Sequence, residues 1–260
     1  MLRTINATRY VTQLREGGSL PAIIEGDDEG MYVLKFRGAG QGPRALIAEL
    51  LCGELARALG LPMPELVFVH VDAALGRNEP DEEVQDLVTA SVGLNLALDF
   101  LPGALGFDPL QASIIDPALA ARIVWFDAFT MNVDRMPNNP NLLLWHRQLY
   151  LIDHGAALYI HHGWANWEQR MLTPFAQVRD HVLLPAAGDL RAADAALAPL
   201  LTAELIAHVV DAIPEAWLND ATSPFATSDA ERAAYRTYLT ARLAPPRHFV
   251  EEAIHARERM

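Results

Sequence analysis

Cysteine is nearly absent from this 260-residue chain, which contains only Cys52. A single cysteine cannot form an internal disulfide and cannot supply a cysteine-based zinc site. The sequence also lacks an HExxH pattern. The neighbouring His161 and His162 do not change this expectation, because adjacent side chains rarely bind the same metal ion. We therefore expect neither a disulfide nor a histidine- or cysteine-based metal centre.

Positive charge is also scarce. Lysine and arginine together number 20, against 33 aspartates and glutamates, so the formal net charge is −13 and the pI is about 5.0. Binding along nucleic acid requires clustered lysine and arginine to neutralise phosphates. The same balance of charge disfavours docking on an anionic membrane surface. We expect no nucleic-acid partner and no membrane partner.

Long apolar runs are missing as well. No stretch of about 18 residues is free of both charge and proline, so we expect no membrane-spanning helix. The first residues, MLRTINATRY, lack the apolar core of a secretory signal, which favours a cytoplasmic location. Hydrophobic residues still make up 51% of the chain, enough for a large core in one domain or two lobes. The oligomeric state cannot be predicted.

The most informative stretch is 132–155, NVDRMPNNPNLLLWHRQLYLIDHG. It contains two short apolar runs, 141–145 and 148–152, on either side of a polar break, a pattern that predicts a β-hairpin. The two arms advance by similar distances because each strand residue adds about 3.3 Å. A regular hairpin therefore returns Asp153 to the neighbourhood of Asn139.

Two carboxylates and an amide in this stretch suit a divalent metal and a phosphoryl group. Asp134 lies on the loop before the hairpin and can face both Asn139 and Asp153. Mg²⁺ prefers few carboxylate or amide ligands and takes its remaining oxygens from phosphates and waters. The alternative is an ordinary polar turn, since Asp, Asn and Pro all favour turns.

Glycines separate two strand-like runs near the start of the chain. Gly17, Gly18 and Ser19 lie between the runs at 9–15 and 20–25. Glycine allows backbone N–H groups to approach a phosphate without a side chain in the way. This segment is therefore a candidate phosphate-covering loop, with an ordinary turn as the alternative.

A lysine and a glutamate follow in the next two predicted elements. Lys35 lies in the strand-like run 31–37, where it either points to solvent from an edge strand or serves a site. Glu49 lies beside the apolar stripe of a predicted helix that begins at Gly42-Pro43 and ends at Gly60. A carboxylate near a buried seam needs a cationic partner, and Lys35 is the natural candidate. Glu54 competes with Glu49 for that partner.

The remaining pattern predicts a mixed α+β protein. Further strands are expected at 65–72 and 91–100, with an acidic helix at 79–90 between them. A mostly helical segment at 108–131 contains Asp116-Pro117, a capping residue followed by proline at the first helical position. Helices are expected through most of the chain after residue 200.

Lys35, Glu49, Asp134, Asn139 and Asp153 occur in the order of the polar positions of protein kinases. The strings GGSLP, KFRGAGQGP, LDFLPG and NVDR…NPN resemble those of the HipA-like kinase domain, an atypical branch related to HipA-type and type II phosphatidylinositol 4-kinases. The resemblance implies a bilobed protein-kinase-like fold. A small antiparallel β lobe with one helix would occupy 1–100, and a larger, mainly helical lobe would occupy 101–260.

The resemblance also implies a role for each candidate residue. Asp134 would be the base, Asn139 and Asp153 would bind Mg²⁺, and Lys35, held by Glu49, would bind the α- and β-phosphates of ATP. The remaining ATP contacts would come from Gly17, Gly18 and Ser19 over the phosphates and from backbone groups near Leu98 and Phe100 at the adenine edge. Ser19 could itself be phosphorylated.

The implied activity is ATP- and Mg²⁺-dependent transfer to a hydroxyl acceptor, with serine or threonine of a protein expected. A nucleotide-binding pseudokinase and a small-molecule or lipid kinase are alternatives. A hydrolase is disfavoured because the sequence has no GxSxG motif. The chain departs from ordinary kinases in reading Val-Asp-Arg and Asp-His-Gly where those read His-Arg-Asp and Asp-Phe-Gly, and its phosphate loop has fewer glycines.

Overall fold

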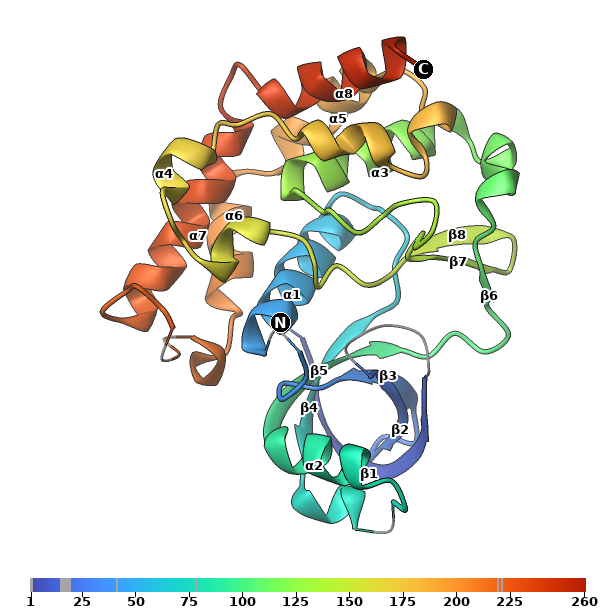
Figure 1. Ribbon diagram of the computed structural model, residues 1–260, viewed down its shortest axis with the longest axis vertical. Coiled ribbons are helices and arrows are strands. Elements are labelled where there is room, and N and C mark those ends of the chain that lie inside the picture. The colour runs from blue at the N-terminus through green and yellow to red at the C-terminus, as the bar shows by residue number, and fades with distance from the viewer. Residues whose placement is uncertain (1, 15–19, 41, 78, 219, 221) are drawn as a thin grey trace. The chain divides into compact units, whose positions relative to one another are not determined.

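The computed structural model describes residues 2–14, 20–40, 42–77, 79–218, 220 and 222–260 (Figure 1). Contacts divide the chain into two compact units. Unit 1 comprises residues 1–50 and 64–103, and unit 2 comprises 51–63 and 104–260. The predicted lobes, divided at residue 100, stay a prediction. The predicted phosphate loop at Gly17, Gly18 and Ser19 lies outside the described residues.

Unit 1 is built around a closed barrel. Its strands, in barrel order, are β1 (Thr4–Gln13), β2 (Ala22–Gly26), β3 (Met31–Lys35), β5 (Gly93–Asp99) and β4 (Leu66–Val71). Four of the five pairings are antiparallel. The fifth, between β1 and β4, is parallel and closes the ring (Figure 1).

The first strand begins earlier than the sequence predicts. It starts at Thr4 instead of Arg9, and its early residues pair with β4, with Ile5 opposite Val69. The partner lies more than sixty residues away along the chain, so no local pattern indicates the pairing. Ile5 is buried in the barrel core together with Ile24 and Leu34.

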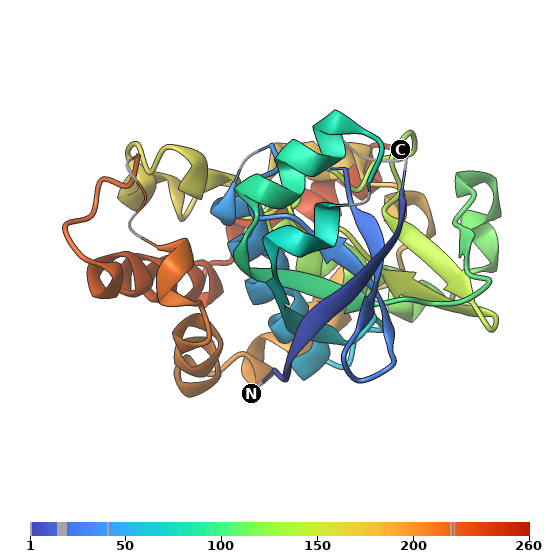
Figure 2. The same ribbon diagram turned by 90° about the horizontal axis from the view of Figure 1, so that it is seen from below.

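The acidic helix of unit 1 is α2 (Glu82–Ala90), which lies over the barrel strands (Figure 2). Asp81 caps it by accepting a hydrogen bond from the N–H of Glu83, which satisfies a donor at the free helix end. Val84 and Val88 pack into the barrel core on the inner side of the helix. A short 3₁₀ helix, η1 (Ala73–Gly76), precedes it.

The long helix α1 (Pro43–Ala58) forms where proline and helical periodicity predict it. Gly60 follows it with a φ of +65°, a left-handed conformation that glycine adopts without a steric penalty. The division between the two units falls within this helix.

Unit 2 is mainly helical. Its α-helices are α3 (Pro117–Thr130), α4 (Trp167–Arg170), α5 (Leu190–Leu197), α6 (Ala203–Asp211), α7 (Ser228–Leu243) and α8 (His248–Glu258). Its 3₁₀ helices are η2 (Pro109–Ile114), η3 (Tyr159–His162), η4 (Ala176–Asp180), η5 (Leu184–Ala186), η6 (Ala198–Leu200) and η7 (Glu215–Trp217). A small sheet of β6 (Leu105–Gly106), β7 (Leu142–Trp145) and β8 (Gln148–Leu151) completes it.

Helix α3 is the centre of unit 2. It contacts α5, α7 and α8, and its residues from 120 to 130 are almost all buried. Trp125 stacks on Phe129 at a centroid distance of 5.6 Å and meets the edge of Phe249 from α8 at 5.5 Å. This packing gives the segment that follows α3 a rigid support.

Among the described residues, no single helix combines the length and apolar character needed to cross a bilayer. One bent pair, 190–200 with 203–211, meets that test by length and composition alone, with a 69° angle between its two parts.

The predicted start of α3 allows a simple stability test. The carboxylate of Asp116 accepts hydrogen bonds from the N–H groups of Ala118 (3.4 Å) and Leu119 (3.1 Å). We expect Asp116→Ala to lower the free energy of unfolding by about 1 kcal/mol, measured by urea denaturation. Asp108→Ala removes a similar cap from the exposed η2 and should have a smaller effect. If both variants lose the same free energy of unfolding, the cap of α3 contributes no more than the exposed cap of η2, and the prediction is wrong.

Candidate active site

The segment after α3 is tied back to a buried carboxylate on that helix. Asp127 is fully buried, and its Oδ1 accepts a hydrogen bond from Nδ2 of Asn132 at 3.0 Å. The Oδ1 of Asn132 in turn accepts a bond from the backbone N–H of Asp134 at 3.2 Å. Asn132 therefore links the backbone of the predicted base directly to the helix.

The side chains of Asp134 and Asn139 lie together. Nδ2 of Asn139 donates to Oδ2 of Asp134 at 2.9 Å, and Nδ2 of Asn141 approaches the same oxygen at 3.4 Å. Residues 136 and 139 bond each other through both backbone groups, at 3.0 and 3.1 Å. The stretch is thus a tight polar turn, and this turn brings the predicted base beside the predicted metal ligand. The amide oxygen of Asn139 is the atom that a metal would use.

The predicted β-hairpin is confirmed. Strands β7 and β8 pair antiparallel, and the turn residues His146 and Arg147 have φ values of +49° and +65°. Two consecutive residues at positive φ match the tight turn that suits the twist of a hairpin. The N–H of Ile152 donates to the carbonyl of Asn141 at 3.1 Å, which closes the open end. Asp153 is the next residue after Ile152.

Asp153 adopts a left-handed backbone conformation, with a φ of +54°. Such a conformation is uncommon outside glycine, although aspartate and asparagine tolerate it better than most residues. It costs conformational energy and is often found at functional sites. The half-buried Asp153 is followed by the buried His154, so the segment is held on one side by the core.

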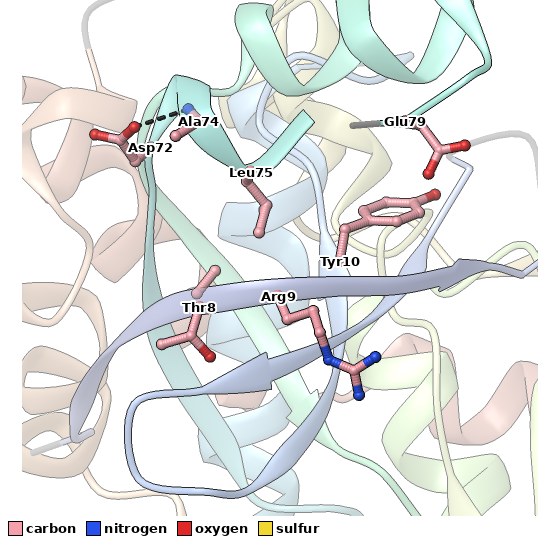
Figure 3. A pocket seen from close by; sticks show the side chains of 8 residues that line it. Thr8, Arg9, Tyr10, Asp72, Ala74, Leu75 and Glu79 are labelled. Carbon is pink, nitrogen blue, oxygen red and sulfur yellow. Dashed lines mark hydrogen bonds between the residues drawn. The ribbon is translucent and has the colours of Figure 1, made fainter. Parts of the chain in front are cut away.

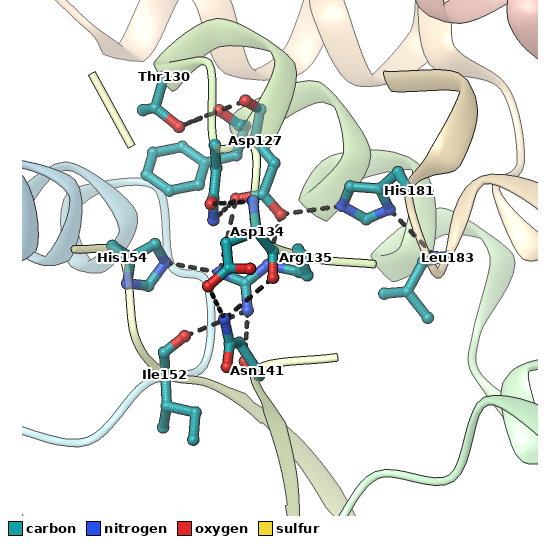
Figure 4. A network of polar contacts seen from close by, with 11 residues as sticks. Asp127, Thr130, Asp134, Arg135, Asn141, Ile152, His154, His181 and Leu183 are labelled. Carbon is teal, nitrogen blue, oxygen red and sulfur yellow. Dashed lines mark hydrogen bonds and ion pairs between the residues drawn. The ribbon is translucent and has the colours of Figure 1, made fainter. Parts of the chain in front are cut away.

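A buried polar network that the sequence did not predict supports this loop (Figure 4). Asp127 forms an ion pair with Arg135, with Nε and Oδ2 2.6 Å apart, and accepts a hydrogen bond from Nε2 of His181 at 2.9 Å. Burial opposes ionisation of Asp127, but the Arg135 charge and the His181 hydrogen bond outweigh it and hold its pKa below the usual range. One signal could have identified Asp127: a carboxylate among apolar helix residues needs a partner. Nothing in the sequence indicated that His181 would contact Asp127.

Unit 1 contains the predicted lysine–glutamate pair. Nζ of Lys35 lies 3.4 Å from Oε2 of Glu49, and the two side chains are 11% and 1% exposed. The solvent-facing alternative for Lys35 is therefore wrong. Glu54, the competing partner, instead pairs with Arg57 at 2.6 Å.

The predicted adenine edge lies at the end of β5. Leu98 is buried and pairs with β3 and β4 on its two sides. The N–H of Phe100 donates to the carbonyl of Met31 at 3.0 Å, so this donor is already used within unit 1. An adenine contact at Phe100 therefore has to use its carbonyl oxygen, and the contact itself stays a prediction.

The candidate metal ligands need help from a substrate. In the described ranges, no group of three or more His, Cys, Asp or Glu side chains is arranged to hold a metal ion. Asn139 and Asp153 would supply one amide and one carboxylate oxygen. That donor set fits Mg²⁺, which keeps several waters and binds substrate phosphates.

Two cavities are lined by other residues. One, of about 370 Å³, lies between β1 and η1 and is lined by Thr8, Tyr10 and Glu79 among others (Figure 3). Burial and the carboxylates of Glu79 and Asp81 raise the pKa of Tyr10 to about 12. The other, of about 610 Å³, lies between α5 and α8. Neither contains a predicted site residue.

Solved structures of kinases resemble this chain. The proinflammatory kinase CtkA of Helicobacter pylori matches with a TM-score of 0.58 and 14% identity, over 97% of this chain and 99% of that one. The Golgi casein kinase with Mn and ADP bound matches with a TM-score of 0.49 and 11% identity, over 96% of this chain and 73% of that one. A comparison with curated proteins gave no match. The likeness to CtkA shows a protein-kinase-like fold that mixes helices and strands.

The model of the HipA-like kinase family matches residues 8–246, which is nearly the whole chain. The match includes both the Lys35–Glu49 pair and the loop that contains Asp134, Asn139 and Asp153. The chain therefore belongs to the HipA-like kinase family and is a phosphotransferase.

Proposed function

We propose that this kinase transfers the γ-phosphoryl group of ATP, with Mg²⁺, to the hydroxyl of a serine or threonine in a protein. The observation that carries the proposal is the arrangement at the open end of the hairpin. There a half-buried carboxylate, Asp134, is bonded to Asn139, and Asp153 follows the closing bond in a strained conformation. Phosphoryl transfer needs a base that orients the acceptor hydroxyl and oxygen ligands that hold the metal, and these three residues would supply them.

Each residue has a distinct proposed role. Asp134 orients the acceptor hydroxyl and takes its proton as the acceptor oxygen forms the new bond to phosphorus and the bond to ADP breaks. Asn139 and Asp153 would bind Mg²⁺, which when present neutralises charge on the phosphates. Lys35, held by Glu49, binds the α- and β-phosphates. Gly17, Gly18 and Ser19, and the backbone near Leu98 and Phe100, are proposed to complete the ATP contacts. The proposed location is the cytoplasm, on the sequence argument alone.

The test is transfer from labelled ATP. Purified protein is incubated with ATP labelled in the γ-phosphate, Mg²⁺ and a cell extract, and proteins and metabolites are analysed by mass spectrometry. We expect label on serine or threonine of a protein, and at least about 10²-fold less label when Asp134→Asn replaces the native protein. Label on a metabolite or lipid would favour the alternative substrate classes. Nucleotide binding without ATP consumption would indicate a pseudokinase and overturn the proposal.

The lysine in unit 1 gives a second prediction. We expect Lys35→Met to lower kcat/KM for ATP by roughly 10²–10³, because the phosphates lose a positioned positive charge. Thermal unfolding must be followed in parallel, since Glu49 is then buried without its lysine. Glu54→Gln, which breaks only the pair with Arg57, is the control and should leave kcat/KM within about two-fold. A folded Lys35→Met protein with native kcat/KM would refute the phosphate role.

A further inference from the structure

The guanidinium of Arg135 is fully buried, and each of its donors has an acceptor (Figure 4). Nε donates to Oδ2 of Asp127 at 2.6 Å, and Nη2 contacts Oδ1 of Asp127 at 3.5 Å and Nε2 of His154 at 3.0 Å. Nη1 donates to the carbonyls of Asn141 and, at 3.2 Å, Ile152. A guanidinium has five N–H groups in a fixed plane, and here all five are used.

The acceptors of Arg135 come from separate parts of unit 2. Asn141 immediately precedes β7, and Ile152 immediately follows β8, so one side chain bonds both ends of the hairpin. Ile152 and His154 are also the two neighbours of Asp153. Arg135 itself is the residue after Asp134. One buried group therefore connects the backbone of the proposed base to both sides of the proposed metal ligand.

We propose that Arg135 is a positioning residue, which fixes the separation between Asp134 and Asp153 and thereby sets the affinity for the metal and the alignment of the phosphoryl group. The proposal rests on the proposed function for its catalytic consequence. Displacements of about 1 Å at such sites can cost about 10²-fold in rate. Partners that orient metal ligands typically change metal affinity or activity by about 10–100-fold when they are lost.

The surrounding network suits this role because each contact of Asp127 and Arg135 has a defined partner. Nδ1 of His181 accepts a bond from the N–H of Leu183 at 3.0 Å, so its Nε2 is the atom that donates to Asp127. Nε2 of His154 accepts from Arg135. The buried carboxylate of Asp127 offsets the charge of Arg135, whose N–H groups are all directed at fixed acceptors of the loop.

Lysine cannot reproduce these contacts. Its ammonium is a point charge with three donors on a flexible stem, and it cannot bond Asp127, both hairpin ends and His154 together. Arg135→Lys therefore keeps the positive charge but loses the contacts that connect the two ends of the hairpin. A second buried arginine offers a matched control: Arg242 is 3% exposed and donates to the carbonyls of Ala128 and Phe129 and of Met171 and Thr173, none of them in the hairpin.

The experiment compares the native protein with Arg135→Lys, His154→Phe and Arg242→Lys by hydrogen exchange and by the kinetics of transfer, with thermal stability followed for each. Amide hydrogen exchange followed by mass spectrometry reports on residues 141–154, and the Mg²⁺ concentration for half-maximal transfer reports on the metal site. In Arg135→Lys we expect faster exchange in 141–154, a rise of about ten-fold in that Mg²⁺ concentration and a fall of about 10² in kcat. Arg242→Lys should lower thermal stability without either change. His154→Phe, which removes one acceptor of Arg135, should move both readouts less far in the same direction.

The outcomes separate the two proposals. If residues 141–154 exchange at the native rate in folded Arg135→Lys, Arg135 does not hold the hairpin and the proposal is overturned. His154→Phe decides the same question if the lysine variant does not fold. If exchange is faster but the Mg²⁺ concentration for half-maximal transfer is unchanged, Arg135 holds the hairpin without setting the affinity for the metal, and that part of the proposal is overturned. If the native protein transfers no phosphoryl group, the proposed function fails, and the exchange measurement still decides whether Arg135 holds the hairpin.

Discussion

Asparagine in place of Asp153 is expected to lower the rate of phosphoryl transfer by roughly 10²–10³, or about 3–4 kcal/mol in the barrier. The substitution removes the charge that would bind the metal and keeps a side chain of nearly the same shape. Asparagine is preferable to alanine as the main variant because Asp153 has a φ of +54°, a conformation that asparagine tolerates better than alanine does. Single-turnover rates at saturating ATP measure the effect directly.

Asp134→Ala is expected to cause a loss of at least the same size for a different reason. It removes the group that orients the acceptor and takes its proton. Raising the concentration of Mg²⁺ or Mn²⁺ should partly restore Asp153→Asn, since the defect is in metal binding, and should leave Asp134→Ala unchanged. Asn138→Ala, in the exposed part of the same turn, is the matched control and should stay within about two-fold of the native rate. Unchanged turnover in the Asp153 variant would rule out its metal role.

The parts of this site that the sequence predicted are those with short-range causes. The hairpin follows from two apolar runs about one polar break, and the turn residues confirm it with positive φ values. The pairing of Lys35 with Glu49 follows from a charge in a strand and a charge beside an apolar helix stripe. In both cases the signal and its partner lie within about fifteen residues of each other.

The parts that the sequence did not predict depend on distant contacts. The parallel pairing of β1 with β4 joins Ile5 to Val69, and the bond from His181 to Asp127 spans 54 residues. Arg135 was visible only as the neighbour of Asp134, with nothing local to show that its side chain points into the core. Such contacts join residues far apart in the chain, so no local pattern in a single sequence indicates them.

The largest stability effect is expected at Asp127. Alanine there leaves the Arg135 guanidinium buried without its counter-charge, which typically costs about 3–5 kcal/mol in the free energy of unfolding. It also removes the acceptor for Asn132 and His181. Asp180→Ala removes a carboxylate of the same unit that pairs with Arg179 at the surface, where the side chains are 54% and 73% exposed, and should cost less than about 1 kcal/mol.

The pH dependence of this effect gives it a sharper test. The pKa of Asp127 is held below its ordinary value of 3.8, so the folded state binds its proton less readily than the unfolded state does. Its stabilisation is therefore fully present above about pH 5 and is lost as the pH falls below about 4. Asp127→Asn carries no charge at any pH, so the advantage of the native protein over this variant should be constant from pH 7 to 5 and should shrink below pH 4 in urea unfolding. An advantage that grows as the pH falls would contradict an ionised Asp127 at the centre of the network.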